Sequence, residues 1–457
     1  MCTTIIKKLF YCLVIIATLP GCKKYLDKKS DSRLSTPGSL KDLQAIIDNY
    51  TANNQSFPML NNGTDEYYLT PGNLNTLDPA ARQSYIWESK TDASVDWTTI
   101  GYKTVFYANT VLDNLEKVDV KGKEDMAMSI KGAALFYRGF AFYNLSQIFA
   151  PPYDPATSKS DLGIPLRLNA DFNEQSRRAT VEETYKQVLD DLQSATTLLK
   201  NTPPPSEPLY KTRPTQTAAL ALLARIYLQM GNYTLALQNC QEALNLYDTL
   251  MIYKDATTFG GNTPFKVFNP EVILYTFTFG ANNGYYFVST VDTTLFASYS
   301  LNDLRRQAFF GKRSNGTYFF KGSYNGTRTN LFNGLTVDEL YLIKAECQAR
   351  LNNTTEAIAA LNHLLERRWK ANSFVAYQAA DASEALGLIL QERKKELVNR
   401  GIRWSDLRRL NKESQYAITL TRKLDDQVYQ LPPNDLRYTY LIPEQVIVMS
   451  GIEQNKR

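Results

Sequence analysis

Apolar residues recur at helical spacing along much of the chain, and the helical segments follow one another in pairs. Between residues 218 and 230, one helical face collects the side chains Leu220, Leu223, Ala224 and Tyr227. Gly231 and Asn232 then interrupt the pattern, and a glycine there permits the sharp turn that reverses the chain. The next helix carries Ala236, Cys240, Ala243 and Leu244 on its inner face. The spacing therefore predicts a helical hairpin.

Small residues of this hairpin stand at the offsets of a tetratricopeptide repeat, namely Ala224, Gly231, Ala236 and Ala243 together with Tyr227. Helical pairs are also expected near 103–149, 181–247 and, more loosely, 336–366. Capping-box spacing marks two helix starts, at Thr180 with Glu183 and at Thr336 with Glu339. Because such pairs cannot bury their apolar faces alone, we expect them to stack into a scaffold.

Two long segments, residues 51–100 and 260–334, lack this periodicity and are rich in polar and aromatic residues. Alternating apolar residues over 271–279 predict a short strand, and the Asn-Gly pairs at 315–316 and 325–326 predict hairpin turns. Long insertions in a helical scaffold usually carry function. The fold class expected is mainly α, a tetratricopeptide-like helical repeat scaffold with large irregular loops and a few short β-hairpins, in one domain over 22–457.

The first residues differ from all that follows. Lys7 and Lys8 precede an apolar run over 9–19, which is too short for a hydrocarbon core that needs about 20 residues. A positive start, a short apolar run and small residues near a cut site are typical of a secretory signal. Cys22 directly follows a glycine, as in a bacterial lipoprotein signal, so we expect a signal peptide over 1–21 and lipid on Cys22. The alternative is an ordinary secreted protein.

Charge and cysteine content narrow the class of protein. Loss of residues 1–21 removes two of the 51 Lys and Arg residues, and the remaining 49 face 46 acids, a formal net charge of +3. A charge this close to neutral, with no cluster of basic residues in the sequence, does not indicate binding to nucleic acid. Cys240 and Cys347 lie on apolar helical faces, where a cysteine packs as a small hydrophobe. No disulfide framework is expected.

Catalytic patterns are sparse. His363 is the only histidine and falls on a repeat helix, where a surface or half-buried role is expected. Acid pairs occur, for example Asp65 with Glu66 and Asp92 with Asp96. A glycosidase needs two carboxylates about 5–10 Å apart, but acid pairs on solvated helices are common. We therefore expect no enzyme, no catalytic residues, no metal and no cofactor, with glycan cleavage as the alternative.

Aromatic residues gather in the two irregular segments. Tyr, Trp and Phe offer apolar faces, and a tyrosine hydroxyl adds a hydrogen-bonding group, so a sugar ring can stack on them while polar neighbours bind its hydroxyls. Core packing is the other role considered for each ring. The residues predicted to contact ligand are Asp65, Tyr67, Tyr68, Arg82, Trp87, Trp97, Tyr285, Tyr286, Tyr299 and Tyr324.

Short motifs are spread over nearly the whole chain in a definite order. They are Asn109-Thr110-Val111-Leu112, the arginine-aromatic run over 137–145 followed by 163–166, the segment 180–192, the repeats over 218–243 and 339–362, the segment 392–407 with Gly401-Ile402-Arg403-Trp404, and 441–444. In this order they resemble the SusD/RagB family of outer-membrane nutrient-binding lipoproteins of Bacteroidetes. The segment 392–409 is expected to serve the scaffold, with Arg403 and Trp404 packing against a neighbouring helix.

The resemblance implies a helical side built on tetratricopeptide-like units and a loop-rich side that binds ligand. It also implies a partner, a SusC-like TonB-dependent transporter, over which the lipoprotein sits as a lid. The expected function is non-catalytic binding of oligosaccharides and their delivery to that transporter. A peptide-binding subunit of the same kind of complex is the alternative. The expected location is the outer membrane, with a lipid anchor and the protein facing the cell surface.

Overall fold

The computed structural model describes residues 37–253, 259, 261–279, 285–327 and 329–457. The expected signal peptide and Cys22 lie outside this range. Among the described helices, none combines the length and the hydropathy that a bilayer crossing requires.

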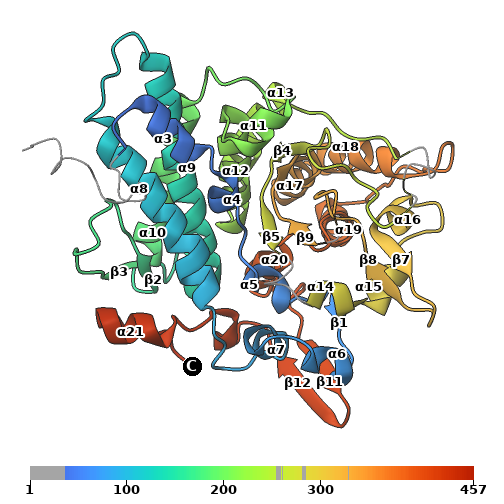
Figure 1. Ribbon diagram of the computed structural model, residues 1–457. Helices are drawn as coiled ribbons and strands as arrows, with labels where there is room; N and C mark the ends of the chain where they lie inside the picture. Colours follow the sequence, from blue (N-terminus) through green and yellow to red (C-terminus); the bar gives the residue numbers. More distant parts are fainter. Residues whose placement is uncertain (1–36, 254–258, 260, 280–284, 328) are drawn as a thin grey trace, which may run out of the picture.

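Paired helices form the body of the molecule, and consecutive ones pack side by side from α8 to α18. In Figure 1 they run from the left side, where α8, α9 and α10 lie together, to α17, α18 and α19 on the right. The mainly α scaffold is thus confirmed. The scaffold helices are α8 (Lys103–Leu115), α9 (Glu124–Phe149), α10 (Val181–Leu198), α12 (Gln216–Gln229), α13 (Tyr233–Leu246), α17 (Val337–Arg350), α18 (Thr354–Leu365), α19 (Ala382–Glu396) and α20 (Arg403–Leu410).

Of the turn and capping motifs predicted for these helices, two are confirmed and one is wrong. Gly231 has φ 75°, which a glycine adopts without strain, and it separates α12 from α13 as predicted. The Thr180 capping box is confirmed, with Glu183 bonding back to the cap. The box predicted at Thr336 is wrong, because the Thr336 side chain caps nothing and the Glu339 carboxylate instead pairs with Arg225 at 2.6 Å.

Short helices fill the rest of the chain. They are α3 (Leu40–Ile47), α4 (Tyr50–Asn53), α5 (Met59–Asn62), α6 (Pro71–Asn75), α7 (Pro79–Tyr85), the π-helix η2 (Val95–Tyr102), α11 (Pro208–Thr212), α14 (Tyr285–Val288), α15 (Thr293–Ala297), α16 (Arg305–Phe309), η5 (Glu366–Arg368), η6 (Leu436–Tyr438) and α21 (Glu444–Ser450). Trp97 lies in η2, which continues directly into α8.

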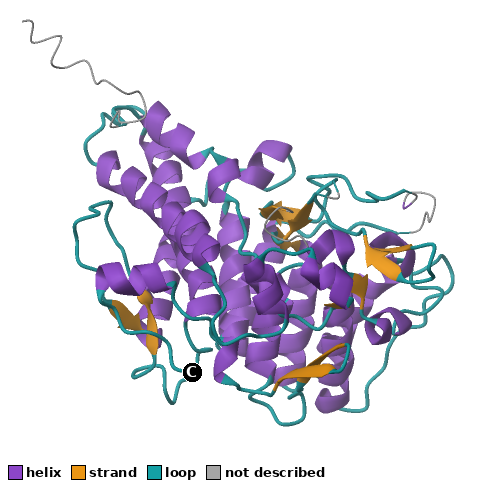
Figure 2. Ribbon diagram, turned by 60° about the horizontal axis from the view of Figure 1, so that its bottom comes forward, coloured by secondary structure: helices purple, strands orange, loops and turns teal. Residues whose placement is uncertain are grey.

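The described strands form six two-stranded antiparallel sheets. Figure 2 shows them as short separate pairs around and between the helices, and β4 and β10 are buried against α12. The pairs are β1 (Tyr67–Tyr68) with β6 (Thr290–Val291), β2 (Leu162–Pro165) with β3 (Arg178–Thr180), β4 (Val272–Leu274) with β10 (Leu335–Thr336), β5 (Phe277–Phe279) with β9 (Asn330–Phe332), β7 (Phe310–Lys312) with β8 (Tyr318–Phe320), and β11 (Leu420–Leu424) with β12 (Gln427–Leu431).

The predicted strand over 271–279 is two short strands, β4 and β5, which pair with different partners. The turn at Asn315-Gly316 does join the hairpin β7–β8, with Gly316 at φ 86°. The hairpin predicted at Asn325-Gly326 is wrong. Gly326 makes a turn at φ 72°, but the next strand, β9, pairs with β5 and not with the strand before the turn.

Two apolar clusters hold the fold together. The larger joins the scaffold helices, and Cys240 and Cys347 are buried in it as free thiols, as predicted. The smaller collects aromatic residues of the irregular segments, among them Tyr67, Tyr285 and Tyr299. The irregular loops therefore have a core of their own, which gives the residues at their surface fixed positions.

Candidate functional site

Most of the aromatic residues predicted to bind ligand are buried. Seven of them expose 4% or less of their surface, namely Tyr67, Trp87, Trp97, Tyr285, Tyr286, Tyr299 and Tyr324. The rings of Tyr67 and Tyr285 stack with centroids 4.2 Å apart, and the Tyr299 hydroxyl donates to the Lys395 carbonyl at 2.7 Å. These rings thus pack within the protein, which was the alternative to ligand contact. Their contact with a ligand stays a prediction.

The remaining predicted residues are half-buried but have different environments. Asp65 forms ion pairs of 2.7 Å with both Arg403 and Lys394, so it joins the segment before β1 to the scaffold. Burial opposes its charge, but the two cations outweigh burial and hold the pKa of Asp65 well below its usual range. Arg82 lies on α7, and Tyr68 lies on β1 at the edge of the aromatic cluster. Of the predicted set, Tyr68 and Arg82 are thus the two residues that are half-buried and form no ion pair among the described residues.

We call Tyr68, Phe287, Arg313 and Phe319 the Arg313 platform, because these partly exposed residues lie on β1, on α14 just before its partner β6, and on the β7–β8 hairpin that packs against β6. Tyr68 pairs with Thr290 of β6, so the two side chains share one face of this sheet. Arg313 donates to Thr290 Oγ1 at 3.3 Å and to the Ser289 carbonyl at 2.7 Å. Its guanidinium also lies 5.3 Å from the centre of the Phe319 ring. Arg313 therefore connects β6 to the β7–β8 hairpin.

The hairpin register sets the position of the Phe319 ring. Phe319 is the cross-strand partner of Gly311, and a side chain at Gly311 would place its Cβ 2.4 Å from Phe319 Cζ. The tip of the ring thus occupies the space that a side chain at residue 311 would fill, because a glycine stands opposite it. Phe287 is 41% exposed on the neighbouring α14. The Phe319 ring therefore lies beside the Arg313 guanidinium, and a second exposed ring stands on α14.

A second accessible pair lies beside the same hairpin. Phe296 of α15 and Tyr318 of β8 stack with centroids 3.7 Å apart, and the Arg306 guanidinium lies 4.5 Å from the Phe296 ring centre. Both rings are half-buried. In Figure 1, α15, β7 and β8 lie together at the right of the molecule, away from the helices α8 to α10. Aromatic rings and arginines are thus combined twice at this loop-rich end.

Trp97 lies far from this end, in a groove of about 260 Å³ on the helical side. The groove also contains Phe106 and Phe172, which are 46% and 85% exposed. Trp97 packs edge-on against Phe149 of α9, with centroids 4.8 Å apart. It is therefore not brought together with the other predicted residues, and anchoring of the helix is its visible role.

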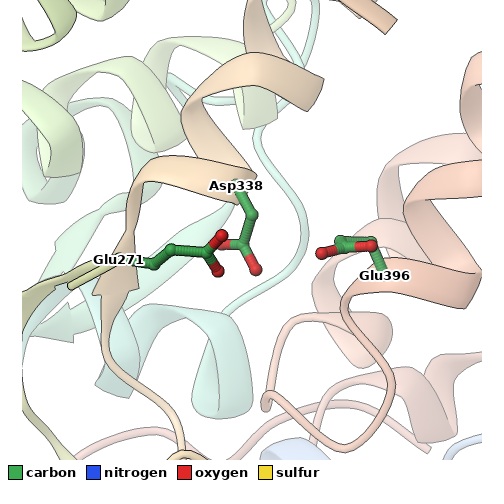
Figure 3. Close-up of side chains that lie close together, drawn as sticks. All are labelled: Glu271, Asp338 and Glu396. Carbon is green, nitrogen blue, oxygen red and sulfur yellow. The ribbon is translucent and has the colours of Figure 1, made fainter. Parts of the chain in front are cut away.

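Three buried acids have the arrangement of a potential metal site, shown in Figure 3: Glu271, Asp338 and Glu396, with carboxylate oxygens within 4.8 Å of one another. These acids already form ion pairs with arginines, however. Arg368 bonds to both Glu271 and Glu396 at 2.7 Å, and Arg400 bonds to Asp338 at 3.1 Å. Burial raises the pKa of Glu271 to about 7, which lowers its tendency to carry charge. The cluster belongs to a buried ion-pair network.

Comparison with known proteins places the chain in a family. A family model described as starch-binding and associating with the outer membrane matches residues 24–228, and a model of the SusD family matches residues 302–447. No protein with a curated description matches the sequence.

Solved structures of SusD-type proteins share the fold over almost their whole length. A SusD superfamily protein of Bacteroides thetaiotaomicron is 20% identical, with a TM-score of 0.73 over 92% of this chain and 100% of its own. A SusD-like carbohydrate-binding protein of Bacteroides vulgatus is 19% identical, with a TM-score of 0.71 over 91% of this chain and 97% of its own. A laminarin-binding SusD-like protein is 16% identical, with a TM-score of 0.66 over 92% of this chain and 99% of its own.

Stacked helical pairs with a loop-rich aromatic end, together with these matches, define a class of carbohydrate-binding proteins associated with the outer membrane. The chain belongs to the SusD/RagB family.

Proposed function

We propose that this protein is a non-catalytic lipoprotein that binds an oligosaccharide at the Arg313 platform and delivers it to a SusC-like TonB-dependent transporter. The observation that carries the proposal is the pairing of accessible aromatic rings with arginines at the loop-rich end. A sugar has an apolar C–H face that fits an aromatic ring and a rim of hydroxyls that accept hydrogen bonds from a guanidinium. Laminarin, which a SusD-like relative binds, is one ligand to test.

Rigidity of the platform favours binding without large rearrangement. Phe319 is seated on Gly311, and Arg313 is held by the Ser289 carbonyl and by Thr290. Side chains that are already ordered lose little conformational entropy when a ligand arrives. Asp65, the only carboxylate among the predicted residues, is engaged by Arg403 and Lys394, and Asp292 next to β6 accepts from the Leu295 amide as the cap of α15, which supports binding rather than acid-base chemistry.

The first test is a calorimetric titration of the purified protein with a panel of oligosaccharides that includes laminarin fragments. We expect at least one to bind and to remain uncleaved after prolonged incubation. Binding of peptides that outcompete every sugar would support the peptide alternative and contradict the proposal. Release of shortened sugars would contradict the non-catalytic part.

Replacing Phe319 by alanine should weaken binding of that oligosaccharide about tenfold or more, because the sugar loses its stacking surface. Tyr68→Ala should weaken it in the same direction. Both side chains are only partly buried, so the thermal midpoint should change little. The matched control is Phe172→Ala, which removes an aromatic ring that is 85% exposed in the groove of Trp97. If Phe172→Ala weakens binding and Phe319→Ala does not, the site is misplaced.

Membrane attachment through Cys22 has its own test. We expect Cys22→Ala to leave the protein unlabelled by radioactive palmitate and to move it from the membrane fraction to the soluble fraction, because no acyl chains can then be attached. Cys347→Ala, at a buried thiol, is the control and should keep both the label and the membrane location. A Cys22→Ala protein that still carries palmitate would refute this anchor.

A further inference from the structure

A cavity of about 560 Å³ lies between the end of α20, residues 432–440 and the C-terminal tail. It shares no lining residue with the Arg313 platform, and Figure 1 shows the C-terminus at the lower left, away from β7 and β8. Its size falls in the range of small-molecule sites. Pro151, Leu162 and Leu436 give it apolar walls, and Arg408 and Arg178 bring two cations to it.

Arg408 is an unusual buried cation. It is 2% exposed, and its two terminal nitrogens donate to the backbone carbonyls of Gln147 and Ala150. Its Nε has no hydrogen-bond partner among the described residues, and its guanidinium forms no ion pair there. Burial lowers the pKa of Arg408 to about 10, so the group still carries its charge at neutral pH.

Other buried arginines of the described chain are compensated. Seven have a carboxylate partner: Arg138, Arg225, Arg305, Arg368, Arg393, Arg400 and Arg409. Arg422 lies within 5.4 Å of the ring centres of Tyr67, Tyr85 and Trp87. A buried charge without such compensation is costly. Arg408 differs from these arginines because it has no carboxylate partner among the described residues, and its only compensation is the carbonyls at the C-terminal end of α9, where the helix dipole favours a cation.

Two further donors in the same cavity lack partners. Asn411 Nδ2 and the Tyr438 hydroxyl are both buried, and neither completes a hydrogen bond with a described residue. Burial raises the pKa of Tyr438 to about 12. The hydroxyl thus remains protonated and able to donate. All three orphaned groups offer N–H or O–H to an acceptor.

Carboxylates of the cavity wall do not fill this role. Asp435 is engaged by Arg437 at 2.8 Å, and Glu453 is exposed. Asp161 is half-buried and also lines the cavity, but it forms no ion pair with Arg408 or Arg178 among the described residues. Arg178 is satisfied only by neutral oxygens, such as the Gly163 carbonyl at 2.8 Å. The acids of the cavity wall therefore leave hydrogen-bond donors of the cavity without a partner.

We propose that this cavity binds a small carboxylate carried on a sugar-sized body, that is, an acidic sugar of the uronic acid type. The carboxylate would accept from Arg408 Nε, Asn411 Nδ2 and the Tyr438 hydroxyl, as charge-assisted hydrogen bonds require. The volume exceeds what an inorganic anion needs, and the proline and leucine walls suit the apolar face of a ring. This site is separate from the Arg313 platform and does not depend on the function proposed for it.

The test is a calorimetric titration of the full protein with galacturonate, alongside galactose and sodium sulfate at matched ionic strength. We expect one galacturonate to bind, galactose to bind about tenfold more weakly or not at all, and sulfate not to displace galacturonate. Absence of galacturonate binding would mean that water alone fills the cavity and would overturn the proposal. Equal binding of galactose, or displacement by sulfate, would overturn the assignment to an acidic sugar.

Variants locate the site without disturbing the carbonyl contacts of Arg408. Asn411→Asp keeps an acceptor for the Ile418 amide, which now bonds to Asn411 Oδ1 at 3.1 Å, but brings a competing carboxylate to the cavity. We expect it to weaken galacturonate binding about tenfold or more, and Tyr438→Phe to weaken it several-fold, whereas Phe319→Ala should leave it unchanged. Binding that survives Asn411→Asp, or that is lost in Phe319→Ala, would overturn the placement in this cavity.

Discussion

Replacing Arg305 by methionine is expected to reduce the free energy of unfolding by roughly 3–5 kcal/mol, the range for breaking a buried ion pair from one side. Arg305 is fully buried and bonds to Asp303 at 2.7 Å, to Glu392 at 2.6 Å and to Glu396 at 2.9 Å. The variant would leave these carboxylates with fewer cations in an apolar interior. Denaturant unfolding of both proteins measures the difference.

The neighbouring Arg306 provides the matched control, because it is half-buried and its guanidinium lies over Phe296 without an ion pair among the described residues. Arg306→Met should cost about 1 kcal/mol or less. If Arg305→Met costs no more than Arg306→Met, the buried network does not hold the loop-rich end to α19. A large loss would explain how the irregular loops keep a fixed position on the scaffold.

Asp96→Asn should remove a pH dependence of stability. Asp96 is fully buried, its Oδ1 accepts from the Met59 amide at 3.1 Å, and its Oδ2 has no partner among the described residues. Burial raises the pKa of Asp96 from 3.8 to about 7. Since the folded protein holds this proton more tightly than the unfolded chain, the stabilisation is complete below about pH 4 and is lost as the pH rises through 7.

The expected fall attributable to Asp96 is roughly 4 kcal/mol between these pH values. The asparagine variant keeps the acceptor for Met59 and carries no charge, so the difference in unfolding free energy between variant and wild type should shift in favour of the variant as the pH rises. Denaturant melts across this range give the result. Glu116→Gln, at an exposed acid that does not act on Asp96, is the control and should leave the profile unchanged. If the free energy of unfolding depends on pH in the same way in Asp96→Asn and in the wild type, Asp96 is not a buried acid that holds its proton in the folded state.

Helical periodicity predicted the scaffold well because apolar side chains recur every three to four residues along the paired helices, even where a helix such as α12 is buried on all sides. Ala224, Ala236 and Ala243 are fully buried, and Gly231 turns the chain, as their positions in the repeat indicated. Strand pairing was less predictable. The turn at Gly326 has the expected backbone, but its flanking residues pair with β5, some fifty residues away in sequence, and a turn motif carries no information on such a partner.

Site residues could be predicted only as clusters, because composition does not tell which ring of an aromatic run faces the core. In Tyr285-Tyr286-Phe287 the two tyrosines are buried and the phenylalanine is exposed. Arg313 and Phe319 were missed as a pair, although the glycine at 311, opposite Phe319 across the Asn315-Gly316 turn, was a signal in the sequence. The cavity of Arg408 had no local signal, since its walls come from segments that are far apart in the chain.

The most direct measurement is a crystal structure of the protein with the oligosaccharide that binds most tightly in calorimetry. We expect a sugar ring stacked on Phe319, with the Arg313 guanidinium donating to its hydroxyls. Sugar density confined to the groove of Trp97, or to any other surface that leaves Phe319 and Arg313 uncovered, would contradict the proposed binding site.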